Sequence, residues 1–179
     1  REINIDDFII LLEPFGRNTA PAIISAALKS LEIESDPTLL VLSSDHEITN
    51  IEKFLTIVKK GLEYTEKNKL VTFGVIPTLP EIGYGYIKSS KPFGNKEEGF
   101  NIEKFIEKPD IETARKLIKD KRFTWNSGMF MFKAKEIIKE IPAPDFEKQL
   151  DQPSIDDFLK GEIEYSEWLK RDGMWWANK

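Results

Sequence analysis

The sequence predicts an α/β protein with a mixed, mainly parallel sheet flanked by helices. Two observations lead to this prediction. Short apolar runs, each bounded by polar or turn-forming residues, recur along the chain as buried strands do. Between them lie segments whose apolar residues repeat with the spacing of a helix. Strand and helix alternating in this way are typical of a parallel sheet covered on both faces.

The first half of the chain contains three of these apolar runs. We expect strands at 8–12, 38–42 and 70–76. A helix is expected in each interval between them, which gives the order strand, helix, strand, helix, strand. Ligands of such sheets gather beyond the carboxyl ends of the strands, so the loops that follow the first two strands are the places to look for a site.

Capping residues indicate where the expected helices begin. Asn18 or Thr19 can cap the helix before the second strand. Thr49 with Glu52 has the spacing of a capping box for the next helix. Asp110 can cap a third helix in the second half of the chain.

The second half is more polar. Segments 82–87 and 100–106 are expected to be antiparallel strands, and 123–132 another strand followed by a short helix at 133–141. Beyond this point the sequence becomes charged and weakly periodic. We therefore expect residues 1–141 to form one domain and residues 142–179 a divergent carboxyl-terminal segment whose packing the sequence does not predict.

Composition excludes several classes of function. The 179 residues are 40% hydrophobic and 32% charged, with a net charge of −5, which argues against a nucleic-acid partner. No apolar stretch approaches the roughly 20 residues that a membrane helix needs, so no membrane partner is expected. The absence of cysteine rules out disulfides and thiolate metal sites and fits a cytoplasmic location. A single histidine, His46, rules out a multi-histidine metal cluster.

Two loops at expected strand ends carry candidate ligand-binding residues. Arg17, Asn18 and Thr19 precede a helix, where free N–H groups and the helix dipole favour an anion. Asp45 follows the strand at 38–42, and one carboxylate together with substrate phosphates is a common way to hold Mg²⁺. Each has a structural alternative, since an ordinary helix cap or turn uses the same residue types.

Three further candidates lie in the second half. The run Gly-Tyr-Gly-Tyr at 83–86 would suit a ligand lying against bare backbone, although glycine bulges in a hairpin explain it equally well. Glu107 and Lys108 can contact sugar hydroxyls and a phosphate, or form a surface ion pair beside a proline turn. Asn126, directly before an apolar run, can bind a sugar hydroxyl, or its Asn-Ser-Gly sequence can be an ordinary turn.

Taken together, these segments resemble the sugar-phosphate nucleotidyltransferases, in particular the mannose-1-phosphate guanylyltransferases. The resemblance extends from about residue 9 to residue 135, and its strength comes from six segments in the family's order rather than from any one of them. The matching segments are Glu-Pro at 13–14 with Gly-Arg-Asn-Thr-Ala-Pro-Ala at 16–22, Leu-Val-Leu-Ser-Ser-Asp-His at 40–46, Thr-Phe-Gly-Val-Ile-Pro-Thr at 72–78, Gly-Tyr-Gly-Tyr-Ile at 83–87, Phe-Ile-Glu-Lys-Pro-Asp at 105–110 and Trp-Asn-Ser-Gly-Met-Phe at 125–130.

The resemblance implies a Rossmann-like fold of the nucleotide-diphospho-sugar transferase type and transfer of GMP from GTP to mannose 1-phosphate, giving GDP-mannose and pyrophosphate. By the same resemblance Mg²⁺ is the cofactor, and the site residues divide into groups. The resemblance implies that Arg17, Asn18 and Thr19 contact the guanine nucleoside, and that Asp45 binds Mg²⁺ and takes part in catalysis. It implies that the sugar is contacted by Tyr84, Gly85, Glu107 and Asn126. It also implies that Lys108 contacts the sugar phosphate and takes part in catalysis.

The sequence departs from the family in one important respect. The family's glycine-rich triphosphate loop would precede Arg1, so we expect a fragment that is amino-terminally incomplete and weakly active or inactive alone. A separately encoded amino-terminal piece or self-association is expected to cover the exposed sheet edge. The alternatives are a non-catalytic domain that keeps the fold, and a nucleotidyltransferase for another sugar 1-phosphate.

Overall fold

The structure is a computed structural model that describes residues 8–12, 19–91 and 99–140. The chain divides into two compact units. One unit comprises the residues up to 37 together with those from 134 onward, and the other comprises 38–133. The expected carboxyl-terminal segment at 142–179 lies outside the described residues.

In the first unit, two helices pack against each other: α1 (Thr19–Ile33) and α4 (Ala134–Lys139). The helix expected from Asn18 or Thr19 is thus confirmed, and its apolar face is buried through residues such as Ile24 and Leu28. The start of α4 is tied to the turn after α1, because Lys135 N–H donates to Asp36 Oδ1 at 3.0 Å.

The strand expected at 8–12 is not formed, and that expectation was wrong. These five residues are in irregular structure, and their apolar side chains are exposed, from 42% for Leu11 to 85% for Leu12. An apolar run becomes a strand only when a neighbouring strand satisfies its backbone. In the described part of the chain no strand pairs with this segment.

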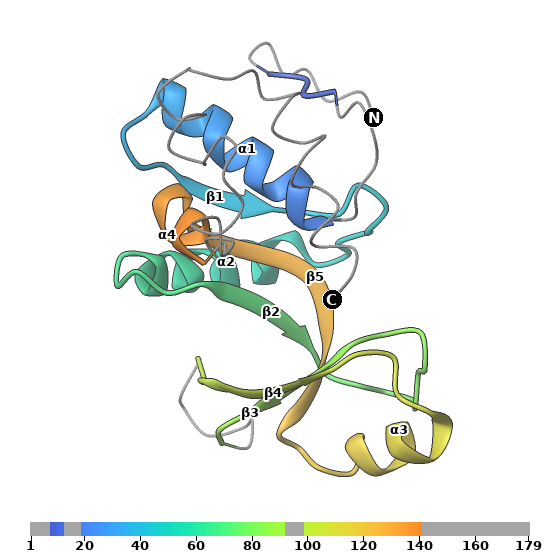
Figure 1. Ribbon diagram of the computed structural model, residues 1–179. Coiled ribbons are helices and arrows are strands. Elements are labelled where there is room, and N and C mark those ends of the chain that lie inside the picture. Colours follow the sequence, from blue (N-terminus) through green and yellow to red (C-terminus); the bar gives the residue numbers. More distant parts are fainter. Residues whose placement is uncertain (1–7, 13–18, 92–98, 141–179) are drawn as a thin grey trace, which may run out of the picture. The chain divides into compact units, whose positions relative to one another are not determined.

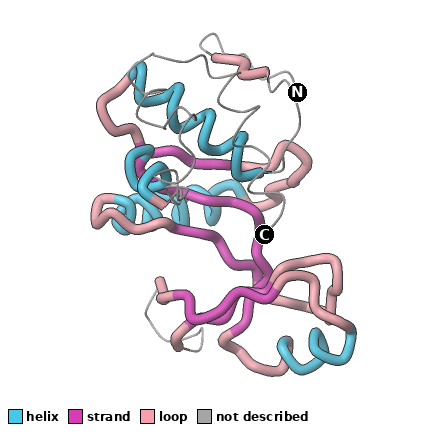
Figure 2. Tube along the Cα trace, in the orientation of Figure 1, coloured by secondary structure: helices cyan, strands magenta, loops and turns pink. Residues whose placement is uncertain are grey.

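The second unit is built on a five-stranded sheet (Figures 1 and 2). The strands are β1 (Thr38–Val41), β2 (Val71–Val75), β3 (Tyr86–Ser89), β4 (Ile102–Ile106) and β5 (Phe123–Lys133). Their order is β1-β5-β3-β4, and β2 pairs with the other side of β5. Figure 1 shows why one strand has three partners: β5, in orange, is long and runs from β1 and β2 to the β3–β4 hairpin.

Every strand pairing in this sheet is antiparallel, which corrects the expectation of a mainly parallel sheet, while the α/β class is confirmed. Because β1, β2 and β3 are each antiparallel to β5, they run in the same direction as one another. The strands β1, β2 and β3 thus share one direction, as in a parallel sheet, but they pair with β5, which lies between β2 on one side and β1 and β3 on the other. The antiparallel pairing of the segments expected at 82–87 and 100–106 is confirmed by β3 and β4.

Two helices belong to this unit. The helix α2 (Ile51–Thr65) contacts β2 and β5, and a β-carbon added at Gly61 would come within 3.2 Å of Met131 Sδ. Its cap is Asn50, whose Oδ1 accepts from Lys53 N at 2.9 Å, rather than the expected Thr49. A one-residue difference of this kind is common, because several polar residues in a row can cap.

The helix α3 (Ile111–Leu117) is capped as the sequence predicts, by Asp110 accepting from Thr113 N at 2.8 Å. It closes a small core beneath β3 and β5. The core contains Tyr86, Ala114, Leu117 and Phe123, with Ile106, Ile118 and Trp125 packed at its edge. None of the helices in the described segments is long and apolar enough to cross a membrane.

Candidate functional site

The candidate site is built around an irregularity in β5. Thr72 of β2 pairs with Phe130, whereas Gly74 pairs with Asn126, so the register advances two residues along β2 but four along β5. The extra residues form a bulge that includes Gly128, whose φ of +71° favours glycine. Bulges of this kind are frequent beside functional sites, where they redirect a side chain.

The side chain of Asn126 holds this bulge. Its Oδ1 accepts from Gly128 N at 3.2 Å and from Thr72 Oγ1 at 3.3 Å. Ser127 Oγ donates to Phe73 O at 2.6 Å, which fixes the next residue. The side-chain amide nitrogen of Asn126, Nδ2, makes no hydrogen bond within the described residues. The Asn-Ser-Gly sequence therefore forms the bulge and still leaves a side-chain amide donor for a ligand.

The bulge lies opposite a gap in the sheet. Trp125 pairs with Val75 on one side and Tyr86 on the other, and Phe130 pairs with Thr72 and Val41 in the same way. It follows that β1 and β3 lie on the same side of β5, and that residues 126–129 between them have no strand neighbour on that side. The carboxyl end of β1 and the beginning of β3 therefore border the same stretch of β5.

Two loops reach this gap. The loop after β1 brings Ser43 close, because a β-carbon at Gly128 would lie 3.6 Å from Ser43 Oγ. The segment before β3 is held by Asn126 N–H, which donates to Gly85 O at 2.8 Å. The loops expected to carry Asp45 and the Gly-Tyr-Gly-Tyr run are thus on the border of one region.

Gly85 provides bare backbone at this point. A β-carbon there would lie 2.7 Å from Phe105 Cζ and 2.9 Å from Glu107 Oε2, closer than real β-carbons approach other atoms. The carboxylate of Glu107 consequently lies against the backbone of Gly85, whose carbonyl is bonded to Asn126. The structure brings together Gly85, Glu107 and Asn126, three of the candidate sugar-site residues, although they are up to 41 residues apart (126 − 85).

Tyr84 takes a neighbouring position. Its ring lies edge to face with Trp125, with centroids 5.3 Å apart and planes at 81°. The side chains of Trp125 and Asn126 alternate to opposite faces of β5. Tyr84 is therefore adjacent to the other sugar-site candidates but packs with the residue before Asn126. It is 51% exposed.

Lys108 follows Glu107 in a left-handed conformation, with φ of +41°. Its Nζ lies 3.8 Å from Glu107 Oε1, and both side chains are largely exposed. The left-handed region costs about 1–2 kcal/mol for a residue with a β-carbon. Such strain is concentrated at functional sites, where the surrounding structure maintains it.

The remaining candidates are less constrained. Asp45 lies exposed in a turn after β1, and in the described residues no group of three acidic or histidine side chains is placed to hold a metal ion. Asp45 thus offers one carboxylate, which suits Mg²⁺ only together with oxygens from a substrate. Thr19 begins α1 in the first unit, and Arg17 and Asn18 lie outside the described residues.

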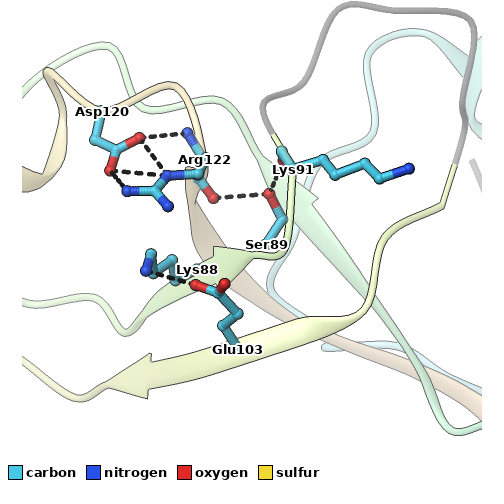
Figure 3. Close-up of polar contacts among 6 residues, drawn as sticks. All are labelled: Lys88, Ser89, Lys91, Glu103, Asp120 and Arg122. Carbon is cyan, nitrogen blue, oxygen red and sulfur yellow. Dashed lines mark hydrogen bonds and ion pairs between the residues drawn. The ribbon is translucent and has the colours of Figure 1, made fainter.

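A second polar cluster occupies the other end of β3 and β5 (Figure 3). Arg122 Nη2 is 2.7 Å from Asp120 Oδ2, and Arg122 N and Nε both donate to Oδ1. Hydrogen bonds from Arg122 lower the pKa of Asp120 to about 2. Ser89 Oγ donates to Arg122 O at 3.1 Å, and Lys88 is paired with Glu103. This cluster fixes the hairpin and is distinct from the candidate site.

Sequence reasoning missed Thr72 and Trp125 as residues of this region. Thr72 looks like any polar residue in a half-buried strand, and nothing in the sequence connects it to Asn126, 54 residues later. Trp125 lies in a segment that resembles the family, but its sequence context predicts no role for it. The signal available was its position directly before Asn126, although strand alternation places the two side chains on opposite faces of β5.

Comparison with known proteins adds the decisive observation. The family described as nucleotidyl transferase matches residues 3–161. The chain belongs to the nucleotidyl transferase family. All the candidate residues fall within the matched range.

Relatives in this family are similar over most of the chain. It is 44% identical over 145 residues to a mannose-1-phosphate guanylyltransferase of Escherichia coli K12, which covers 79% of this chain and 30% of the relative. It is 45% identical over 141 residues to the xanthan biosynthesis protein XanB of Xanthomonas campestris, covering 79% of this chain and 29% of the relative. The chain therefore spans less than a third of the length of these relatives.

Two solved structures are similar to this fold. The structure described as mannose-1-phosphate geranyltransferase from Thermus thermophilus has a TM-score of 0.74 and 30% identity, over 89% of this chain and 45% of that one. The structure described as mannose-6-phosphate isomerase from Helicobacter pylori has a TM-score of 0.62 and 36% identity, over 73% of this chain and 47% of that one. These similarities support the α/β fold found here.

Proposed function

We propose that this chain supplies the sugar-binding part of an enzyme that transfers GMP from GTP to mannose 1-phosphate. The observation that carries the proposal is the arrangement around Gly85, where the Glu107 carboxylate lies against bare backbone whose carbonyl accepts a hydrogen bond from the backbone N–H of Asn126. Carboxylate and amide groups can pair with the hydroxyls of a sugar, and bare backbone lets its ring come close. The names of the relatives support mannose and guanine.

In the proposed reaction, a phosphate oxygen of mannose 1-phosphate attacks the α-phosphorus of GTP. The new P–O bond forms as the bond from the α-phosphorus to the bridging oxygen breaks, and pyrophosphate leaves with that oxygen. The reaction requires no covalent intermediate with the protein. It requires alignment of two anions and neutralisation of their charge.

Each candidate residue has a role in this proposal. Glu107 accepts hydrogen bonds from sugar hydroxyls, and Asn126 donates its free amide N–H to another. Lys108 neutralises the charge of the sugar phosphate. Its backbone is left-handed, and its ammonium group lies beside the carboxylate of Glu107. Tyr84 and Gly85 form the wall against which the sugar lies.

The nucleotide end is assigned to Arg17, Asn18 and Thr19, by resemblance alone. Asp45 would hold Mg²⁺ together with substrate phosphates, and the ion would supply positive charge to the transferring phosphoryl group. Substrates of this kind and the absence of cysteine fit a reducing, cytoplasmic setting.

The activity is proposed for a protein of the length of the relatives, since this chain spans less than a third of them. In the described sheet, β1 is an edge strand. We propose that a separately encoded piece or a second copy of the chain pairs with this edge. Light scattering during size-exclusion chromatography tests the second copy: a monomer at all concentrations would contradict it.

Binding of GDP-mannose by isothermal titration calorimetry tests the sugar site directly. We expect binding that is weakened at least 10-fold in Glu107→Gln, because a carboxylate acceptor is lost. Glu103→Gln is the matched control, since Glu103 lies on β4, the strand that directly precedes Glu107, but is ion-paired with Lys88, and its affinity should stay within twofold of the parent. Tighter binding of GDP-glucose or ADP-glucose than of GDP-mannose would reject the proposed substrate.

A further inference from the structure

Asn126 lies in the sheet between two glycines. Gly74 of β2 is its partner on one side. Gly85 lies opposite it on the other side, because Tyr86 pairs with Trp125 and the two strands are antiparallel. Side chains of directly opposite residues lie on the same face of a sheet, and glycine has no side chain. The residues directly across from Asn126 therefore do not hold its amide group in place.

Two hydrogen-bond donors contact this amide group instead. Thr72 Oγ1 donates to Asn126 Oδ1 at 3.3 Å and lies 3.2 Å from Met129 O, so its proton is within reach of both ends of the bulge. Gly128 N donates to the same Oδ1 at 3.2 Å. Thr72 and Asn126 are both half-buried. Donors from two different segments thus converge on the amide oxygen of Asn126.

These two donors determine which end of the amide faces the bulge. A flipped amide would place its NH₂ group against the N–H of Gly128, so that two donors would face each other. With the oxygen bonded to Thr72, the nitrogen is directed away from β2. The strand β3 lies on the other side of β5 from β2. Glu107 lies on the same face as the Asn126 side chain, since its carboxylate occupies the space where a β-carbon of Gly85 would be.

We propose that Thr72 is a positioning residue that makes Asn126 a hydrogen-bond donor toward the ligand. This inference rests on the proposed function, in which Asn126 donates to an oxygen of the sugar. Thr72 contacts Asn126 rather than the ligand. It holds the amide oxygen toward the bulge, so that the free N–H groups of the same amide are presented to the sugar. The site thereby favours a ligand with an oxygen that can accept at this position.

Replacement of Thr72 by residues of similar shape tests this proposal. Thr72→Val keeps the branched side chain but has no hydroxyl, whereas Thr72→Ser keeps the hydroxyl. Affinity for GDP-mannose, measured by isothermal titration calorimetry, should fall roughly 3- to 10-fold in Thr72→Val, because one ligand hydrogen bond loses its oriented donor. It should stay within about twofold of the parent in Thr72→Ser. Parental affinity in Thr72→Val, or equal losses in the two variants, would overturn the inference.

Ser127→Ala is the matched control for a loosened bulge. Ser127 Oγ also joins the bulge to β2, by donating to Phe73 O at 2.6 Å, and its hydrogen bonds in the described part of the chain do not involve the Asn126 side chain. We expect this variant to lower the melting temperature by about 2–4 °C, with affinity for GDP-mannose within about twofold of the parent. If Ser127→Ala loses as much affinity as Thr72→Val, the loss reflects the bulge as a whole and the inference is overturned.

A double-mutant cycle separates this inference from the proposed function. Asn126→Asp retains an acceptor for the bulge but has no amide donor to orient, so adding Thr72→Val to it should change affinity by less than about twofold. A full additional loss would overturn the inference. Weakened binding in Glu107→Gln and Asn126→Asp with parental affinity in Thr72→Val rejects the inference and keeps the proposed function. No binding of GDP-mannose by the parent rejects both.

Discussion

The carboxylate of Glu107 lies over the backbone of Gly85, with Oε2 only 2.9 Å from where a β-carbon at that position would be. The contact leaves no room for a β-carbon at Gly85 while Glu107 holds this position, and it joins the end of β4 to the beginning of β3. The carbonyl of the same glycine accepts from Asn126 N–H, so β5 meets both segments there. Substitutions at this junction distinguish a ligand-binding role from a purely structural one.

Alanine at Gly85 should reduce binding with little loss of stability. Its β-carbon would meet the far ends of Phe105 and Glu107, which are exposed enough to move aside. We expect a melting temperature within about 3 °C of the parent and GDP-mannose affinity at least 10-fold lower, because Glu107 is displaced. Calorimetry measures both quantities.

Gly74→Ala and Gly83→Ala are the controls for that experiment. At Gly74 the β-carbon would lie 2.3 Å from Oγ1 of Thr124, which is buried, so we expect a loss of about 1–3 kcal/mol in unfolding free energy. At Gly83 the nearest atom is 3.4 Å away, an ordinary contact. Equal binding by Gly85→Ala and Gly83→Ala would show that the position of Glu107 is irrelevant to the ligand.

Asn126→Asp should separate the two roles of this side chain. Aspartate keeps an oxygen acceptor for Gly128 N and Thr72 Oγ1, so the bulge is retained. The amide donor is lost and a negative charge is added, so affinity for the anionic GDP-mannose should fall at least 10-fold. Asn126→Ala should lose both binding and stability. If aspartate destabilises the protein as much as alanine, the amide nitrogen has a structural role as well.

Lys108→Gly should relieve strain while removing charge. Glycine adopts φ of +41° without steric cost, which stabilises the folded protein, but it also gives the unfolded chain greater freedom. Because these two effects oppose each other, the free energy of unfolding should change by no more than about 1 kcal/mol in either direction. Affinity for mannose 1-phosphate should fall about 10-fold, because a cation is lost. The control is Asn68→Gly, at the other described non-glycine residue with positive φ, which should leave affinity unchanged.

Acid should weaken the hairpin through Asp120. The pKa of this carboxyl is about 2 in the folded protein against 3.8 ordinarily, because Arg122 donates hydrogen bonds to the charged form. A lowered pKa in the folded state means that the stabilisation is complete above about pH 4 and is lost as the pH falls toward 2. Chemical denaturation at pH 5, 3.5 and 2.5 should therefore show a smaller acid-induced loss of stability in Asp120→Asn than in the parent. Parallel pH profiles would show that the ion pair contributes nothing.

Local patterns in the sequence predicted most of the elements. Apolar runs located β1, β2 and β5, helical spacing located α1 and α2, and Asp110 was recognised as a cap from its position alone. These features depend on neighbouring residues, so the sequence contains the information directly. The same local reasoning failed at 8–12, where an apolar run without a partner strand stays irregular and exposed.

The candidate residues Gly85, Glu107 and Asn126 were named from residue chemistry and from the resemblance of their segments to one family. Family membership follows from the sequence too, since the match covers residues 3–161. Residue chemistry limits what each side chain can bind, whatever the fold. The sequence by itself therefore determined which groups are available.

Only the tertiary structure decided how those groups meet. The insertion of β5 between β1 and β2 gives it antiparallel pairings with β1, β2 and β3, and β1 and β3 lie on the same side of β5. The bulge at Asn126 follows from the register between β2 and β5, and the contact of Glu107 with Gly85 follows from the pairing of β3 with β4. Strand pairing joins residues far apart in the chain, and its free energy comes from backbone hydrogen bonds and packing that no local pattern encodes.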